Sequence, residues 1–178
     1  GVVVHAEHFS ANNVDDQYIL WNNYYEYQFT NADKVDLFIV ATDRQKEILA
    51  EQFAKYTNHQ PAIYTIPVGS LASLPQNENR TPFSMITASR LATEKHIDWL
   101  VRAVVRAKKE LPELSFDIYG KGGEEGKLRS LIDELGAADY IHLKGHANLE
   151  EIYKNYEVYL SASTSEGFGL TLMEAIGS

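Results

Sequence analysis

Short apolar runs alternate with amphipathic segments along the second half of the chain. The apolar runs have the length and composition of buried strands, and between them apolar residues recur at three- and four-residue steps. The predicted strands are 83–89, 115–120, 140–145 and 158–163. This alternation is typical of βαβ units, in which helices join and cover the strands of a parallel sheet.

The segments between these strands predict helices with one apolar face each. The face of the first helix, 94–111, consists of Ile97, Leu100, Val101, Val104 and Val105. The face of the second consists of Leu128, Leu131, Ile132 and Leu135. A shorter third helix is expected at 149–156, and a fourth begins at Leu170.

The first part of the chain is less regular. Strands are predicted at 2–9, 35–42 and 62–67. Thr42 and Gln45 have the spacing of a capping box, which predicts that a helix begins at Asp43 and runs to Tyr56. The aromatic-rich run 18–29 is expected to pack against this sheet, with an aromatic platform for a sugar as the alternative.

The stretch 68–82 is rich in turn-forming residues and has no apolar periodicity. We place an inter-domain linker at 76–82, which gives an N-terminal domain in 1–75 and a C-terminal domain in 83–178. The first domain looks incomplete. The chain has no initiating methionine and stops within an apolar helical pattern, so we expect a fragment of a longer protein.

Composition narrows the classes of function. The net charge is −9, which disfavours a protein that binds a nucleic-acid backbone through many Lys and Arg side chains. The absence of cysteine favours a reducing compartment. No apolar run reaches the roughly 18 residues that a membrane span requires.

The stretch SEGFGLTLMEA carries two glutamates, Glu166 and Glu174, on either side of a glycine pair. It follows a predicted strand, so Glu166 is expected at the carboxyl edge of the sheet, where ligands bind in open parallel sheets. Gly167 and Gly169 leave the backbone uncovered where a helix begins, which favours phosphate. Carboxylates beside a phosphate site suit a ligand that also has hydroxyls, such as a nucleotide sugar. For one glutamate alone, a solvated helix or loop position is the alternative.

Two cations follow the first strand of the second domain in the same way. Arg90 and Lys95 of SRLATEK lie at the entry to a helix, where either could pair with a phosphate. The segment GKGGEEGKL does not fit a P-loop, because five residues separate Gly120 from Gly126 where that motif has four, and Leu128 replaces its Ser or Thr.

No metal site is predicted. His5 and His8 are three apart in a predicted strand and therefore face opposite sides of it. The chain also contains no Asp-x-Asp motif, which agrees with a metal-independent enzyme.

Four segments together resemble a known family. SRLATEKHIDWL, DIYGKGGEEGKL, IHLKGHANLEEIY and SEGFGLTLMEAIGS are similar, in order and spacing, to the C-terminal nucleotide-binding domain of retaining GT-B glycosyltransferases of family 4. The resemblance covers nearly all of Ser84–Ser178. It implies an α/β GT-B fold with two Rossmann-like domains. VVVHAEHF, VDLFIVAT and IYTIPVG stand where the end of the family's acceptor domain would place them.

The resemblance also implies roles for single residues. Arg90 and Lys95 would neutralise the donor diphosphate, Glu174 would bind the ribose hydroxyls, and Glu166 would hold the transferred sugar. The further donor-binding residues that it implies are Gly167, Phe168, Gly169, Leu170, Thr171, Gly120, Gly122, His146 and one of His5 and His8. No cofactor or metal is implied beyond the nucleotide sugar itself.

Within the family, the segments VVVHAEHFSANN and NNYYEYQFTNADKVDLFIVATDRQ resemble protein O-GlcNAc transferases of an accessory secretion system. The implied reaction is transfer of GlcNAc from UDP-GlcNAc to Ser or Thr of an unfolded serine-rich-repeat adhesin, with a paralogous inactive GT-B subunit as partner. The alternatives are a wall teichoic acid α-glycosyltransferase and a non-catalytic GT-B subunit that binds the acceptor. The resemblance implies a cytoplasmic location, with peripheral association with the inner face of the membrane as a variant.

Overall fold

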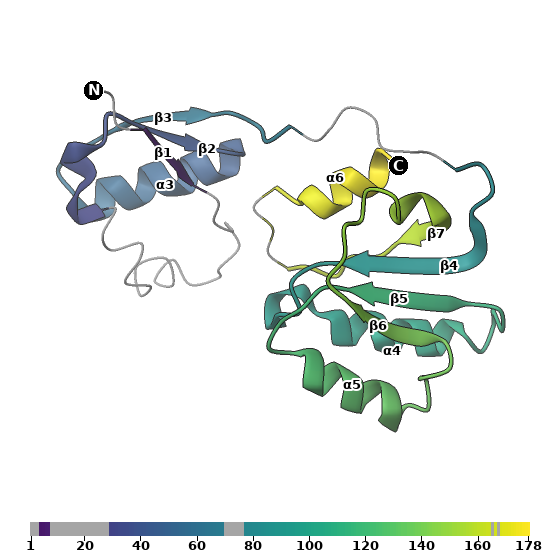
Figure 1. The fold of residues 1–178 in the computed structure, drawn as a ribbon. Coiled ribbons are helices and arrows are strands. Elements are labelled where there is room, and N and C mark those ends of the chain that lie inside the picture. Colours follow the sequence, from purple (N-terminus) through teal and green to yellow (C-terminus); the bar gives the residue numbers. More distant parts are fainter. Residues whose placement is uncertain (1–3, 8–28, 70–76, 165, 167) are drawn as a thin grey trace. The chain divides into compact units, whose positions relative to one another are not determined.

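The computed structural model describes residues 4–7, 29–69, 77–164, 166 and 168–178. The chain divides into two compact units (Figure 1). The first contains the residues up to Gly69 together with Ser165–Phe168, and the second contains Ser70–Thr164 and Gly169–Ser178. Each unit is built on a parallel sheet, which the sequence pattern predicts for the second.

The first unit holds a sheet with the strand order β1-β2-β3, formed by Val4–Glu7, Leu37–Val40 and Ala62–Thr65. A 3-10 turn, η1 (Ala32–Lys34), precedes β2, and the helix α3 (Asp43–Tyr56) follows it. The predicted capping box is confirmed. Thr42 Oγ1 accepts from the Gln45 amide at 3.2 Å, and Gln45 Oε1 accepts from the Thr42 amide at 3.1 Å, so two amides that the helix leaves unpaired gain partners.

Three phenylalanines form the centre of the first unit. The ring of Phe53 from α3 lies 4.8 Å from that of Phe38 in β2 and 5.1 Å from that of Phe29. All three side chains are buried. Phe29 is the last residue of the predicted aromatic run, and the rest of that run lies outside the described residues.

The second unit has a four-stranded parallel sheet with the order β6-β5-β4-β7. Its strands are β4 (Thr81–Ala88), β5 (Ser115–Tyr119), β6 (Ile141–Gly145) and β7 (Tyr156–Tyr159). The chain moves outward from β4 to β5 and β6 and then crosses back to place β7 on the other side of β4. The strand order therefore reverses between β4 and β7, and parallel sheets bind their ligands at the carboxyl edge of such a switch point.

Two helices cover one face of this sheet, α4 (Ile97–Ala107) and α5 (Glu125–Glu134) (Figure 1). The predicted apolar faces are confirmed, since both helices bury them against Phe116 and Ile118 of β5. Buried positions of the two helices are Ile97, Leu100, Val101, Val104, Leu128, Leu131 and Ile132.

The other face is covered by the 3-10 turn η3 (Tyr153–Asn155) and the helix α6 (Leu170–Ile176) (Figure 1). Its core is smaller and rich in tyrosine. Tyr119 and Tyr153 are buried with Ile86 and Ala88 of β4, and Tyr159 packs against them.

Several predicted boundaries are wrong. The helix predicted at 94–111 is split into the 3-10 turn η2 (Thr93–Lys95) and α4, because His96 between them has a left-handed backbone with φ 45°. Where a third helix was predicted there is only η3, because the chain already enters β7 at Tyr156. β4 begins at Thr81, inside the predicted linker 76–82, because Thr81 pairs with Tyr156.

The strand predicted at 158–163 is shifted toward the N-terminus and shortened to β7. After Leu160, whose amide donates to the Ile86 carbonyl, the chain leaves the sheet, and Thr164 bonds to the backbone of Glu94 instead. Among the helices of the described residues, none is long and apolar enough to span a bilayer.

Candidate active site

Three loops of the second unit begin at the same edge of its sheet, each directly after a strand. Arg90 follows β4, Lys121 follows β5 and His146 follows β6. Because all four strands are parallel, their carboxyl ends lie together, and the switch point between β4 and β7 is part of that edge. The fold therefore gathers polar side chains that are far apart in the sequence.

A cavity of about 330 Å³ lies at this edge. It is lined by Ala88, Ser89, Arg90, Tyr119, Gly120, Lys121, His146, Ala147, Leu149 and Thr171. Four residues that the sequence nominates are thus brought together: Arg90, Gly120, His146 and Thr171. Its cationic side chains, Arg90 and Lys121, suit an anionic ligand.

Arg90 is held by a neighbour that the sequence did not nominate. Its Nη2 donates to Glu94 Oε1 at 2.7 Å, while 73% of the Arg90 side chain stays exposed. Burial raises the pKa of Glu94, but hydrogen bonds from its own backbone amide and from Arg90, together with the charges of Arg90 and Lys95, outweigh this effect and hold that pKa below its ordinary value. Glu94 is therefore the ionised partner of Arg90 at neutral pH.

Glu94 also connects this pair to the loop after β7. Its carbonyl accepts from the Thr164 amide at 3.1 Å and from Thr164 Oγ1 at 3.4 Å. Lys95 is the next residue of η2 and is half-buried, and it does not line the cavity. Through η2, the position of Arg90 is thus coupled to the stretch that leads into SEGFG.

The two predicted glycines serve a close approach of loops. A Cβ on Gly120, whose φ is 137°, would stand 1.8 Å from the Ser89 carbonyl oxygen. A Cβ on Gly122 would stand 2.2 Å from the Leu91 carbonyl oxygen. The loops are joined by bonds from the Ser89 amide to the Tyr119 carbonyl and from the Leu91 amide to the Lys121 carbonyl. Both glycines therefore fix the cavity wall, whereas their approach to a donor stays a prediction.

The polar side of α6 faces two tyrosines. Gly169, with φ 77°, precedes the helix, and Thr171 Oγ1 lies 2.9 Å from the Tyr159 hydroxyl. One turn later, Glu174 Oε2 accepts from the Tyr153 hydroxyl at 3.5 Å. Burial, followed by the neighbouring Tyr159 and Glu174, raises the pKa of Tyr153 well above its ordinary range. Tyr153 therefore remains a donor at every physiological pH.

The other nominated residues are not placed in this cavity. Glu166 is exposed, and its neighbours Ser165 and Gly167 lie outside the described residues. Phe168 is half-buried, and Leu170 is 45% exposed at the start of α6. His5 belongs to β1, and His8 lies outside the described residues.

The sequence reasoning missed Lys121, Ser89, Tyr119 and Leu149, which line the cavity. A usable signal existed for Lys121, because it stands directly after the strand end and Gly120, in the same position relative to β5 as Arg90 has relative to β4. Glu94 was inside a quoted motif, but only the folded η2 shows that it contacts Arg90.

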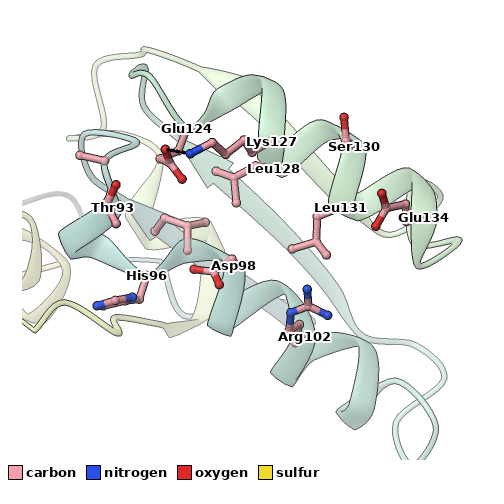
Figure 2. A pocket seen from close by; sticks show the side chains of 12 residues that line it. Thr93, His96, Asp98, Arg102, Glu124, Lys127, Leu128, Ser130, Leu131 and Glu134 are labelled. Carbon is pink, nitrogen blue, oxygen red and sulfur yellow. Dashed lines mark hydrogen bonds and ion pairs between the residues drawn. The ribbon is translucent and has the colours of Figure 1, made fainter.

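A larger cavity, of about 500 Å³, lies between α4 and α5 and shares no residue with the first (Figure 2). Its rim carries charges of both signs, among them Asp98, Arg102 and Glu134, and Lys127 Nζ bonds to Glu124 at 2.7 Å. It contains none of the nominated residues. The site is therefore identified by its place at the carboxyl edge, and not by volume.

Within the described residues, no group of three or more His, Asp or Glu side chains is placed to hold a metal ion. The cations and hydroxyls of the smaller cavity could instead bind an anionic organic ligand directly.

The strand order and the polar cavity at the switch point define an α/β protein of the nucleotide-binding, doubly wound type. A family model described as "Glycosyl transferases group 1" matches residues 73–177, more than half of the chain. The chain belongs to this glycosyltransferase family. The predicted α/β GT-B fold is confirmed by the solved structures that it resembles.

Two relatives with high sequence identity are informative. The chain is 72% identical over 178 residues to the UDP-N-acetylglucosamine–peptide N-acetylglucosaminyltransferase GtfA subunit of Streptococcus pneumoniae serotype 4, and 70% identical over 179 residues to that of Streptococcus gordonii. These matches cover 99% and 100% of this chain and 35% of each relative. The chain thus spans about a third of the length of these relatives.

Among solved structures, the pneumococcal O-GlcNAc transferase GtfA in complex with UDP and GlcNAc matches with a TM-score of 0.84 and 72% identity, covering 99% of this chain and 35% of that one. TarM of Staphylococcus aureus matches with a TM-score of 0.80 at 24% identity, covering 97% of this chain and 34% of that one, which is a likeness of fold alone.

Proposed function

We propose that the complete protein is a retaining glycosyltransferase that transfers GlcNAc from UDP-GlcNAc to Ser or Thr of a serine-rich-repeat adhesin. The observation that carries this proposal is the 72% identity, over 99% of the chain, to a relative named a UDP-N-acetylglucosamine–peptide N-acetylglucosaminyltransferase subunit. The matching structure of such a transferase with UDP and GlcNAc supports the donor.

In this proposal the second unit, whose sheet begins with β4 at Thr81, is the donor domain, and the first unit is the end of the acceptor domain. Arg90 reaches the cavity from an exposed position, so its guanidinium is available to a diphosphate once it exchanges Glu94 for phosphate oxygens. Lys95 adds a second positive charge from η2. Both charges would stabilise the leaving UDP as the glycosidic bond breaks.

The carboxylates of Glu174 and Glu166 bind the hydroxyl-bearing parts of the donor. Glu174, fixed by Tyr153, accepts from the ribose hydroxyls, and Glu166 accepts from the transferred sugar. The amides from Phe168 to Thr171 precede or open α6, where backbone N–H groups have no partner within the helix, and they add contacts to phosphate. His146 borders the same cavity and approaches the nucleobase. One of His5 and His8 approaches the donor sugar.

In this proposal the acceptor hydroxyl and the leaving UDP lie on the same face of the sugar, which gives retention of configuration. The protein then contributes position and charge stabilisation, and needs no nucleophile of its own. We propose that transfer needs neither a metal nor a cofactor. Activity that survives EDTA and is unchanged by added Mg²⁺ or Mn²⁺ would support this, and loss of activity in EDTA that is restored by either ion would contradict it.

The acceptor is an unfolded Ser/Thr-rich polypeptide, presented with the help of a paralogous, inactive GT-B subunit. A solved GtfA/B complex matches the chain at 70% identity with a TM-score of 0.73, which supports a partner of that kind. We propose a cytoplasmic location, with peripheral association with the inner face of the membrane as a variant.

The test uses the complete protein, co-expressed with its partner subunit, UDP-GlcNAc and a Ser/Thr-rich repeat peptide. Intact-mass analysis should show a ladder of N-acetylhexosamine increments on the peptide. An unchanged peptide in a reaction that converts UDP-GlcNAc would reject the protein acceptor while keeping the transferase.

A teichoic acid acceptor is the second candidate. It is favoured by 26% identity over 182 residues to the poly(glycerol-phosphate) α-glucosyltransferase of Bacillus subtilis, of which the chain covers 26%. Poly(glycerol phosphate) in place of the peptide tests it, and a glycosylated polymer beside an unmodified peptide would decide for it. A GT-B subunit without catalysis would bind acceptor and convert no donor in either reaction.

A further inference from the structure

The helix α6 has little apolar anchorage within the second unit. None of its residues is buried, and Leu170, Leu172, Met173 and Ile176 are 45%, 44%, 38% and 69% exposed. Polar contacts with the face of the sheet formed by β4 and β7 add to the anchorage of this helix.

Two such contacts come from tyrosines on the inner side of the helix. Thr171 and Glu174 are three residues apart and therefore share one face of α6. Each meets a tyrosine hydroxyl, Thr171 that of Tyr159 at 2.9 Å and Glu174 that of Tyr153 at 3.5 Å. The two tyrosine rings pack edge to face with their centroids 6.1 Å apart, so they form one rigid support.

Tyr159 ties this support to the first loop of the cavity. Its hydroxyl donates to the Ala88 carbonyl at 3.3 Å, and Ala88 directly precedes Ser89 and Arg90. Since a phenol has a single proton, the Thr171 hydroxyl donates to the Tyr159 oxygen. The start of α6 is thus fixed relative to the end of β4.

Tyr153 acts on the carboxylate itself. Its side chain is 2% exposed, so its hydroxyl is not free to turn into water. The bond to Glu174 Oε2 selects one orientation of that carboxylate, one turn after Thr171, which lines the cavity. A carboxylate whose rotation is restricted in this way loses less conformational entropy when it accepts two hydroxyls from a vicinal diol.

We infer that Tyr153 is a positioning residue for Glu174, and that it sets the preference of the site for a ribose with both hydroxyls. This inference rests on the proposed function, because it takes Glu174 as the carboxylate that receives the ribose. It assigns Tyr153 no contact with the donor. The role is instead carried through a single hydrogen bond.

The experiment compares Tyr153→Phe with the wild type in the complete protein. Calorimetry measures the Kd for UDP and for 2′,3′-dideoxy-UDP, which lacks both ribose hydroxyls. Tyr153→Phe should raise the Kd for UDP about 5-fold, because the lost hydrogen bond to the carboxylate acts on the nucleotide only indirectly. The affinity for 2′,3′-dideoxy-UDP should change less than about 2-fold, and KM for UDP-GlcNAc should rise about 5-fold at nearly constant kcat.

Tyr156→Phe is the matched control. Tyr156 packs on the same face of the sheet, but its hydroxyl donates to Asp117 Oδ2 at 2.5 Å and not to α6. Its loss should leave both affinities unchanged. In the double variant Tyr153→Phe/Glu174→Gln, the affinity for UDP should equal that of Glu174→Gln alone, because the tyrosine acts only through the carboxylate.

Three results would overturn the inference. An equal rise in the Kd for UDP and for 2′,3′-dideoxy-UDP in Tyr153→Phe would show that Tyr153 has a general packing role. Unchanged affinity for UDP would show that the hydrogen bond is not needed. A wild-type protein that binds neither nucleotide would reject the proposed function, and with it this inference.

Discussion

The two faces of the four-stranded sheet are built in different ways. The face under α4 and α5 is a continuous layer of aliphatic side chains around Phe116 and Ile118. The face under η3 and α6 is smaller, and its tyrosines form hydrogen bonds through their hydroxyls. Tyr156 bonds to Asp117 in this way, and Tyr159 bonds to Thr171. Apolar burial does not depend on direction, whereas hydrogen bonds do. The first face therefore stabilises the domain, and the second sets the geometry of the site.

The largest effect is expected on the free energy of unfolding, when a buried side chain of the aliphatic face is truncated. Phe116→Ala removes a side chain with no exposed surface and should lower the free energy of unfolding by about 3–5 kcal/mol. Urea unfolding of the complete protein, followed by circular dichroism, measures it. Leu111→Ala is the control, because Leu111 is 40% exposed and its truncation should cost well under half as much. Equal losses in the two variants would contradict the assignment of stability to this face.

At the cavity, the charge of Arg90 should affect activity without affecting folding. Arg90→Ala should lower kcat/KM for transfer by about 10²–10³-fold, as expected when one group that stabilises developing charge is removed. The melting temperature should hardly move, because the side chain is 73% exposed. Arg129→Ala is a matched control on α5, where Arg129 pairs with Glu125 at 3.4 Å in the same i,i+4 arrangement. Full activity of Arg90→Ala would refute the site.

The wall of the cavity can be tested through its glycines. Gly120→Ala should destabilise the protein by about 2–3 kcal/mol and weaken UDP binding, because a Cβ there meets the Ser89 carbonyl at 1.8 Å in a left-handed backbone. Gly123→Ala, three residues later, places its Cβ in open space and should do neither. Thermal unfolding and UDP titration of both variants measure the difference. A stable Gly120→Ala variant with normal affinity would show that the two loops separate at little cost.

The smallest effect is expected at Glu94. Its depressed folded-state pKa means that the pair with Arg90 adds stability above the unfolded-state value of about 4.3, and that this stability is lost as the pH falls through the folded-state value. Glu94→Gln should therefore lower the free energy of unfolding by under about 1 kcal/mol at pH 7, and the difference should shrink below about pH 4. Thermal unfolding at both pH values measures it. A stability difference between the wild type and Glu94→Gln that grows at low pH would contradict a stabilising ion pair between Glu94 and Arg90.

Much of the fold could be predicted from the sequence. The helix α3 with its capping box, the apolar faces of α4 and α5 and the start of α6 all follow from local spacing. The boundaries around η2 and η3 could not be predicted, because the left-handed His96 and the early start of β7 depend on contacts with other segments. Arg90, Gly120, His146 and Thr171, which the sequence nominates, line one cavity, and their roles stay predictions. Lys121 and Tyr119 line the same cavity and were not nominated.

The sequence by itself determined the parallel α/β architecture and the motif residues, because hydrophobic periodicity and turn chemistry are local properties of the chain. Only the tertiary structure decided which side chains meet. Tyr153 and Glu174 are 21 positions apart, and Ala88 and Tyr159 are 71 apart. Their contacts depend on the strand order β6-β5-β4-β7, which places β7 beside β4. Periodicity does not specify that order, since every strand of the sheet has a similar apolar pattern, and it is the packing of the whole domain that selects it.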